Sequence, residues 1–328
     1  MIKTRITELL GIRYPILMGA MYRLTSAEMV SAVAEAGGLG FIPSASFTSP
    51  EDVRAEIRKV RAMTNKPIGL NISLVPAVNP GLEGIQALVA VGIEEQVSAF
   101  ETAGASPASF IDQIKKAGIP VLHKVTQLKH AKSAEAMGAD AVIVIGFEGG
   151  GYLGSTEIAT MILVNSVARS LSIPVIAAGG VVDGCGLTAA LALGAEGVLM
   201  GTRFIASTEA FLHRKIQEWM IRTGETDTEV LLRSFKSPVR FISNKVTRTI
   251  ASMEKEGSSM QEMLGIIGPA QKKDIHFDDD TENRLFPVGL GVSMIDHIKP
   301  IAEIIQDIVR DAETAMNRLD RMRGVKAK

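Results

Sequence analysis

The chain has 328 residues and carries 35 lysines and arginines against 36 aspartates and glutamates, giving a formal net charge of −1. Such a balance excludes a basic nucleic-acid-binding surface and a strongly acidic tail. Hydrophobic residues make up 46% of the sequence and aromatic residues only 5%. This composition favours an α/β protein with a large aliphatic core over a lectin-like β-sandwich.

Cys185 is the single cysteine, so we expect neither an intrachain disulfide nor a cysteine-based zinc or iron–sulfur site. The five histidines include no H-x-x-x-H pair, and we expect no metal. The N-terminal sequence has no signal-peptide pattern, and no apolar run reaches the ~18 residues of a membrane span. We therefore expect a cytoplasmic protein that acts on a small molecule and binds neither nucleic acid nor membrane. Both a monomer and a homodimer are compatible with the sequence.

A recurring unit fills the first two thirds of the chain. A helical stretch ends at a glycine, and a short β-branched run follows, which is typical of a strand buried on both faces of a parallel sheet. Eight successive βα units favour a TIM (β/α)8 barrel, with an open doubly wound sheet as the alternative. The eight predicted strands begin near Pro15, Gly38, Pro67, Gly92, Pro120, Ala141, Pro174 and Gly197.

The pattern changes after Thr202. Two stretches, 204–224 and 252–268, are predicted to be helical, and a polar irregular segment follows them. A last helix is predicted over 299–322, and it would close the ring. We interpret the chain as a barrel formed by residues 1–210 and 296–328, with a helical cap formed by residues 211–295.

The ends of the last two strands suggest an anion site. They read Ala178-Gly179-Gly180 and Met200-Gly201-Thr202. Loops at these positions of a barrel often bind phosphate through backbone N–H groups and a helix N-terminus. The hydroxyl of Thr202 can add a hydrogen bond. Tight turns without a ligand are the alternative explanation of the same glycines.

A second glycine pattern competes with this one. Residues 184–189 read G-x-G-x-x-A, and Glu209 follows 20 residues later, near the place of a ribose-binding acid. That acid should end a second strand, whereas Glu209 lies in a helical stretch. We therefore interpret the pattern as unrelated to dinucleotide binding.

Three consecutive glycines, 149–151, follow the sixth strand. A planar ring can lie against backbone that carries no side chains, although a mobile loop would have the same composition. Together with a neighbouring phosphate site, the glycines suggest a flat phosphorylated cofactor, and FMN fits. Asn71, at the end of the third strand, can hydrogen-bond to a flavin edge or cap a turn.

These segments resemble the nitronate monooxygenase (2-nitropropane dioxygenase) family of FMN-dependent TIM barrels. Its superfamily includes the flavin-dependent enoyl-[acyl-carrier-protein] reductases of bacteria. The most specific likeness covers residues 148–207, and 5–21 and 66–74 also fit. The segment 237–248, SPVRFISNKVTR, is similar to the enoyl reductase branch.

The resemblance implies a set of FMN contacts. Backbone near the first strand would approach the ring, two polar side chains would reach the ring edge, and glycine-rich loops would hold the ribityl chain and phosphate. In that order, the residues are Gly19, Ala20 and Met21; Asn71 and Lys124; Gly150 and Gly151; and Gly179, Gly180, Gly201 and Thr202.

Position 152 departs from the family pattern, which usually has a catalytic histidine after the glycine pair. Tyr152 stands there instead. Its reference pKa near ~10, against ~6.5 for histidine, makes it a poor base, but it can donate a proton or pack over the flavin. His123 is a second catalytic candidate, or a packing histidine. Strand alternation points His123 and Lys124 to opposite faces.

Three functions follow from the resemblance. The first is an FMN-dependent oxidoreductase that oxidises a small anionic nitronate with O2. The second is an NAD(P)H-dependent reductase of enoyl thioesters. The third is a flavin-binding barrel without turnover, because Tyr152 replaces the histidine. We interpret the acidic run Asp278–Asp280 as a solvated charge run rather than a metal site.

Overall fold

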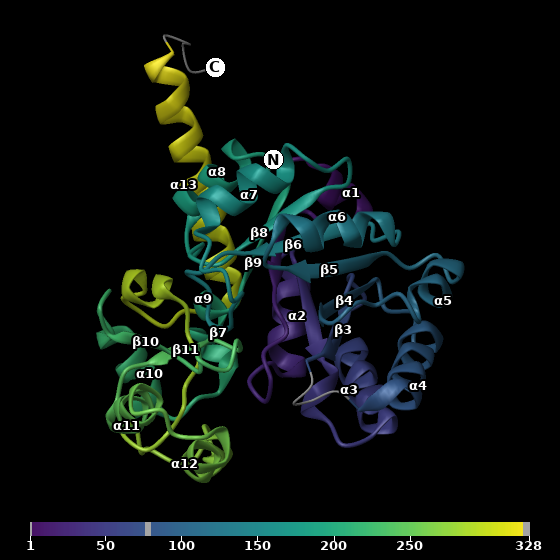
Figure 1. Cartoon of the computed structure of the whole chain (residues 1–328). Coiled ribbons are helices and arrows are strands. Elements are labelled where there is room, and N and C mark those ends of the chain that lie inside the picture. Colours follow the sequence, from purple (N-terminus) through teal and green to yellow (C-terminus); the bar gives the residue numbers. More distant parts are fainter. Residues whose placement is uncertain (1, 76–79, 324–328) are drawn as a thin grey trace.

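The computed structural model describes residues 2–75 and 80–323, and eight parallel strands form a closed barrel (Figure 1). The predicted TIM barrel is confirmed. Around the barrel the strands follow the order β1-β2-β3-β4-β5-β6-β8-β9. Their bounds are β1 Ile16–Met18, β2 Leu39–Pro43, β3 Gly69–Leu74, β4 Ala99–Gly104, β5 Val121–Val125, β6 Ala141–Ile145, β8 Val175–Ala178 and β9 Gly197–Met200.

Helices between the strands form the outer layer. Four helix-stop glycines of the predicted repeat, Gly37, Gly118, Gly138 and Gly194, have positive φ as left-handed C-caps require. The helix bounds are α2 Ala27–Glu35, α3 Pro50–Met63, α4 Gly81–Glu94, α5 Ile111–Lys116, α6 Leu128–Ala136, α7 Thr160–Ala168, α8 Gly184–Ala192, α9 Thr202–Ile205 and α13 Ile301–Met322.

The barrel interior is a core of its own. Side chains such as Leu17, Phe41 and Leu122 pack together there. The short helix α1 (Arg5–Leu10) adds Ile6 and Leu10 to the same cluster, so the N-terminal segment closes the end of the barrel opposite the strands' carboxyl ends. Chemistry is therefore confined to the other end.

The predicted start of the fourth strand at Gly92 is wrong, because the residue lies inside α4 and the strand begins at Ala99. A Cβ on Gly92 would lie 2.4 Å from the ring of Phe100 in β4. The glycine therefore lets the helix pack closely on its own strand. The chain reverses at Gln96 instead, with a φ of 51°.

The G-x-G-x-x-A pattern also serves packing. Gly184 begins α8, and a Cβ there would lie 2.2 Å from the backbone nitrogen of Ala312 in α13. The two helices thus touch through their backbones. Glu209 accepts hydrogen bonds from the backbone N–H of Ile301, at 3.0 and 3.1 Å, and so caps the start of α13.

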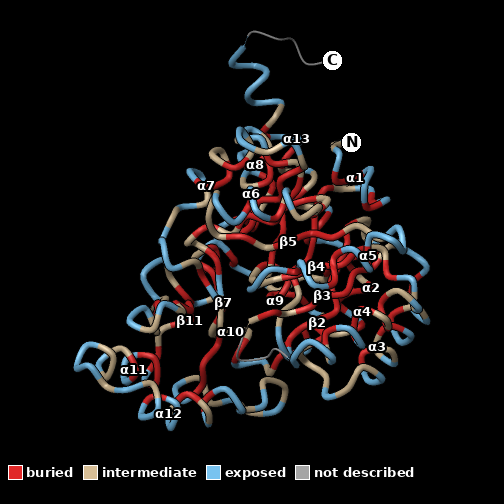
Figure 2. Tube along the Cα trace, turned by 45° about the vertical axis from the view of Figure 1, so that its right-hand side comes forward, coloured by how far each residue is buried: buried red, intermediate tan, exposed pale blue. Residues whose placement is uncertain are grey.

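The cap is not purely helical, which corrects the prediction for residues 211–295. It contains α10 Arg214–Arg222, β10 Thr228–Leu231, β11 Val239–Ile242, α11 Lys245–Lys255, α12 Met260–Lys272 and the 3-10 helix η4 Leu290–Met294. Its sheet has the order β10-β11-β7, and β7 (Gly151–Tyr152) comes from the loop after β6. Figure 2 shows buried residues in the barrel strands and again around β11. Both long predicted helices are interrupted, one at Phe211 (φ 46°) and one at Gly257 (φ 80°).

The acidic run is not simply solvated, which corrects the expectation of a solvated charge run. Asp279 forms an ion pair with Lys215, and Asp280 forms one with Lys273. Arg284, almost fully buried, donates hydrogen bonds to the backbone carbonyls of Asp280 (2.7 Å) and Asp278 (2.9 Å). The run therefore shapes the irregular segment that leads back to the barrel. No helix among the described residues has the length and apolar content needed to cross a bilayer.

Replacing Gly184 with alanine tests the contact between α8 and α13. The added Cβ meets backbone that cannot move aside, so we expect the free energy of unfolding to fall by about 1–3 kcal/mol. Gly265 in α12 is the matched control, because a Cβ there meets nothing within 4 Å. G265A should leave stability equal or raise it by up to about 1 kcal/mol. Denaturant unfolding measures both, and equal stabilities for the two variants would contradict the packing role.

Candidate active site

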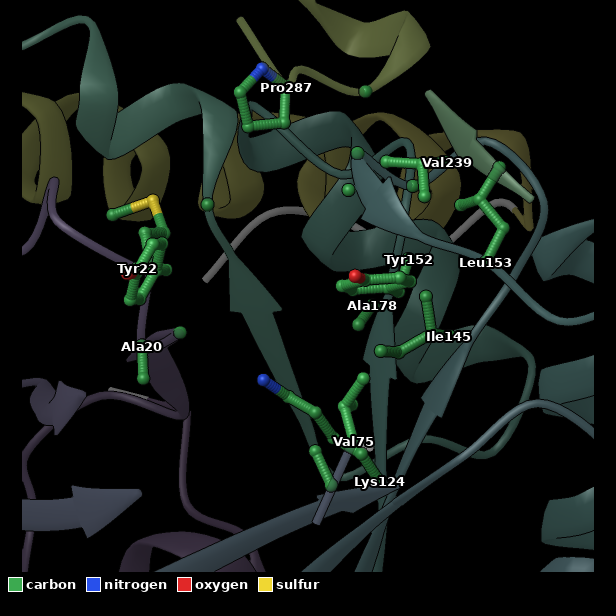
Figure 3. A pocket seen from close by; sticks show the side chains of 18 of the residues that line it. Ala20, Tyr22, Val75, Lys124, Ile145, Tyr152, Leu153, Ala178, Val239 and Pro287 are labelled. Atoms are coloured by element: carbon green, nitrogen blue, oxygen red, sulfur yellow. The ribbon is translucent and has the colours of Figure 1, made fainter. Parts of the chain in front are cut away.

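A cavity of about 1020 Å³ lies at the carboxyl ends of the strands, between barrel and cap (Figure 3). All the site residues predicted from the sequence line it. They are Gly19, Ala20, Met21, Asn71, His123, Lys124, Gly150, Gly151, Tyr152, Gly179, Gly180, Gly201 and Thr202. The topology thus brings together residues that are far apart in the sequence, while their individual roles remain predictions.

The loops after β8 and β9 form one corner of the cavity. Gly179 and Gly180 have φ values of 92° and 76°, a conformation that residues with side chains rarely adopt. A Cβ on Gly179 would lie 3.0 Å from backbone atoms of the loop after β6. The Thr202 hydroxyl accepts a hydrogen bond from the Gly289 N–H at 2.9 Å, which leaves its own proton free to donate. Together with the start of α9, these groups suit an anion.

Polar side chains form the floor of the cavity. Asn71 and Glu101 are neighbours in the register of β3 and β4, and both are buried. The Lys124 ammonium forms an ion pair with the Glu101 carboxylate. The second carboxylate oxygen of Glu101 has no hydrogen-bond partner among the described residues. The floor therefore offers a cation, held from beneath by the buried Glu101, and an amide to a ligand with a polar edge.

His123 faces away from this floor. Lys124 shares the interior face of β5 with Leu122, whereas His123 lies on the face of Val121 and Val125. Its Nδ1 is 2.7 Å from the hydroxyl of Thr102 on β4. Burial lowers the pKa of His123 to about 4, so the ring is neutral at neutral pH. His123 still lines the cavity, along with His130 of α6, so both members of the His123–Lys124 pair reach it.

The glycine loop after β6 is held by the cap, so it is not a mobile loop at the barrel opening. Gly151 and Tyr152 pair with Arg240 and Val239 of β11. A Cβ on Gly150 would lie 2.4 Å from the backbone of Val288. The loop therefore needs its glycines for close backbone contact with the cap, in addition to any contact with a ligand.

Arg240 holds this loop through hydrogen bonds to its backbone. Its guanidinium donates hydrogen bonds to the carbonyls of Phe147 (2.9 Å) and Gly149 (3.2 Å) and to the hydroxyl of Thr228 (3.0 Å). It also stacks on the Phe147 ring, 5.1 Å from the ring centre. On the other side, Leu290 N–H donates to the Glu148 carbonyl at 2.9 Å.

Tyr152 is about half exposed on β7, and partial burial raises its pKa. Figure 3 shows its hydroxyl directed towards the open centre of the cavity. The phenol is thus protonated at neutral pH, which suits a proton donor and not a base.

Several residues of the site escaped sequence reasoning. The pattern that places the fourth strand at Gly92 does not reveal Glu101, because the strand begins at Ala99. Arg240 and the segment 287–291 carry no local site signal, because only the folded cap brings them to the glycine loop. The SPVR segment, which resembles the enoyl reductase branch, is the one sequence feature that points to Arg240.

Comparison with known proteins places this geometry in a family. The family model "Nitronate monooxygenase" matches residues 3–311. The chain belongs to the nitronate monooxygenase family. Members of this family are oxidoreductases, and the expected relationship and enzyme class are confirmed.

Relatives within and near the family have different names. FabK of Thermotoga maritima superposes with a TM-score of 0.90 at 38% identity, covering 98% of this chain and 100% of that one. A "(3aS,4S,5R,7aS)-5-hydroxy-7a-methyl-1-oxo-octahydro-1H-indene-4-carboxyl-CoA dehydrogenase" of Rhodococcus jostii (strain RHA1) is 37% identical, covering 82% of this chain and 72% of the relative. A "Probable nitronate monooxygenase" of Staphylococcus haemolyticus is 32% identical, covering 76% and 81%.

The buried His123 makes stability depend on pH. The unfolded histidine takes up a proton near pH ~6.5, whereas the folded one does so only near pH 4. The unfolded state therefore binds more protons between these values, and the free energy of unfolding should fall by roughly 3 kcal/mol as the pH drops from 6.5 to 4. His123→Asn should lose this part of the slope. The exposed His297 is the control, and H297N should keep it. Equal slopes for wild type and H123N in denaturant unfolding would refute the burial effect.

Proposed function

We propose that this chain binds FMN and uses it to reduce the conjugated double bond of an acyl thioester, with NAD(P)H as the electron source. The residues present fit FMN on three counts. The loops at Gly179–Gly180 and Gly201–Thr202 suit its phosphate. The Lys124 ammonium, paired with the buried Glu101, and the Asn71 amide suit the polar edge of a flavin ring, which presents both donors and acceptors. The flavin-dependent family adds support.

The cavity's roof supports a substrate with an apolar chain. The cavity volume of about 1020 Å³ exceeds the range of about 300–1,000 Å³ for a single small-molecule ligand, which suits a site that holds FMN and a substrate together. The cap supplies an apolar wall opposite the polar floor, and such a wall suits an acyl chain. Its residues are Leu231, Val239, Phe241, Ile267, Leu285 and Phe286. The Rhodococcus relative, named for a carboxyl-CoA substrate, points to the same class.

Tyr152 is the observation that carries the choice of reaction. Reduction of an enoyl thioester adds a hydride at the β-carbon and a proton at the α-carbon. FMN, when bound, would supply the hydride, and a hydride from NAD(P)H would restore the reduced cofactor. A phenol directed into the cavity, with its pKa raised by burial, is suited to hold and deliver that proton. The same phenol cannot easily remove a proton from a neutral nitroalkane.

Nitronate oxidation with O2 is the second candidate. It is favoured by the family model and by the Staphylococcus relative. A substrate that is already a nitronate anion needs no base, so Tyr152 does not exclude this reaction.

Anaerobic mixing of the FMN-loaded protein with NADH or NADPH tests the proposal. The visible absorbance of the flavin should bleach and should return on addition of an α,β-unsaturated acyl-CoA. Tyr152→Phe should leave bleaching unchanged and slow reoxidation by about 10²–10⁴-fold, because the proton donor is lost. Tyr152→His should retain part of the reoxidation rate.

Two outcomes would overturn this assignment. Oxygen uptake with an alkyl nitronate, without bleaching by NAD(P)H, would favour the second candidate. A bound flavin that reacts with neither would favour a barrel without turnover. Full reoxidation rates in Y152F would remove Tyr152 as the donor while leaving the reaction standing.

A further inference from the structure

The exposed aromatic side chains of this protein gather at one place. Four are exposed within residues 2–75 and 80–323: Tyr22, Tyr152, Phe211 and Phe277, with exposed fractions of 56%, 48%, 69% and 78%. Tyr22 and Tyr152 line the cavity. Phe211 and Phe277 flank His276, which also lines it. Two of the four exposed rings thus line the cavity, and the other two lie against a histidine that lines it.

Phe211, His276 and Phe277 form a cluster of three rings on the cap side of the mouth. The centres of Phe211 and His276 are 5.8 Å apart, and those of His276 and Phe277 are 6.3 Å apart. His276 Nδ1 lies 2.5 Å from the Phe211 carbonyl oxygen, and Asp274 accepts the backbone N–H of His276 at 2.7 Å. These hydrogen bonds to His276 fix the segment that carries the rings, although the two phenylalanine rings themselves are exposed to solvent.

The backbone at Phe211 supports a ligand-binding role. Its φ of 46° lies in the left-handed region, which is unfavourable for a bulky residue. The chain thus accepts a strained conformation to present an exposed ring. Preordered rings lower the cost of ordering a binding surface.

Arg23, a cation, lies on the same rim. Arg23 lines the cavity next to Tyr22, and its backbone N–H donates to the Ser46 hydroxyl at 2.8 Å. No carboxylate in the described part of the chain forms an ion pair with its guanidinium. The pKa of Asp274 is lowered, first by the His276 N–H and to the smallest degree by the charge of Arg23, so the Arg23 guanidinium lies within electrostatic reach of a residue next to the ring cluster. An unpaired guanidinium is suited to a phosphate.

We propose that Tyr22, Arg23, Phe211, His276 and Phe277 bind the adenine-nucleotide end of a ligand whose reacting end lies in the cavity. The adenine stacks on the rings, and Arg23 pairs with phosphate. Coenzyme A thioesters and NAD(P)H share this adenosine phosphate chemistry, whereas a thioester on a carrier protein lacks adenine. The inference deepens the proposed function and rests on it for the identity of the reacting end.

Titration of the FMN-loaded protein with ADP tests the site without turnover. Phe277 is exposed, so Phe277→Ala should fold normally, and the loss of stacking should raise the Kd for ADP by at least about fivefold. Arg23→Gln should weaken ADP by a similar factor. Met161, 66% exposed on α7 and outside the cavity, gives the control M161A, which should bind ADP like wild type.

Parallel titrations with coenzyme A and with NADH identify the source of the nucleotide, because only the ligand whose remaining part also enters the cavity should bind markedly more tightly than ADP, and F277A should weaken that ligand as well. Absence of ADP binding, or equal ADP affinity in F277A and M161A, would overturn the proposal. So would a dimer in sedimentation that F277A dissociates, because the rings would then be an interface between copies. ADP binding without enoyl-thioester turnover would uphold this site and reject the proposed reaction; turnover without ADP binding would do the reverse.

Discussion

The contact between the loop after β6 and the cap governs the rest of this structure. Arg240 binds the carbonyls of Phe147 and Gly149, and β7 adds a strand to the cap sheet. Each hydrogen bond from a charged donor is worth about 1.5–3 kcal/mol, and a buried guanidinium without partners would be costly. A flexible glycine-rich segment is thereby fixed at the mouth of the barrel. The same contact gives the cap its position, so floor and roof of the cavity are set together.

The resulting site separates polar from apolar recognition. The floor carries Asn71 and Lys124, the latter paired with the buried Glu101, the corner at Gly179–Gly180 and Thr202 suits an anion, and the cap supplies an apolar wall. A cofactor that is flat, polar at one edge and phosphorylated at one end matches the first two. An acyl chain matches the third. Tyr152 lies where these regions meet, on the strand that the cap holds in place.

Local signals in the sequence were enough to predict the barrel, because each helix-stop glycine and buried strand acts over a few residues. The error at Gly92 shows the limit of that logic. A glycine that ends a helix and a glycine that lets a helix touch its strand look identical until the ring of Phe100 is placed. A fourth strand that starts at Gly92 would also end before Glu101, which lies within β4.

The cap sheet was beyond local reasoning for a different reason. Tyr152 and Val239 pair across a long stretch of sequence, and two-residue β7 has no strand pattern of its own. The glycines of 149–151 were noticed, but their contact with Val288 depends on the cap's return segment. The glycine loops suggest a flat phosphorylated cofactor, but only the family resemblance implies flavin chemistry, since periodicity cannot specify it.

The most direct test asks whether the cap contact builds the cofactor site. It compares the FMN dissociation constant of Arg240→Met with that of Arg248→Met, an exposed control on α11. Quenching of flavin fluorescence on mixing with apoprotein would measure both. If Arg240 fixes the glycine loop over the site, R240M should bind FMN at least about tenfold more weakly, while R248M and the circular dichroism of both variants stay like wild type. Equal FMN affinity for R240M and wild type would contradict the account.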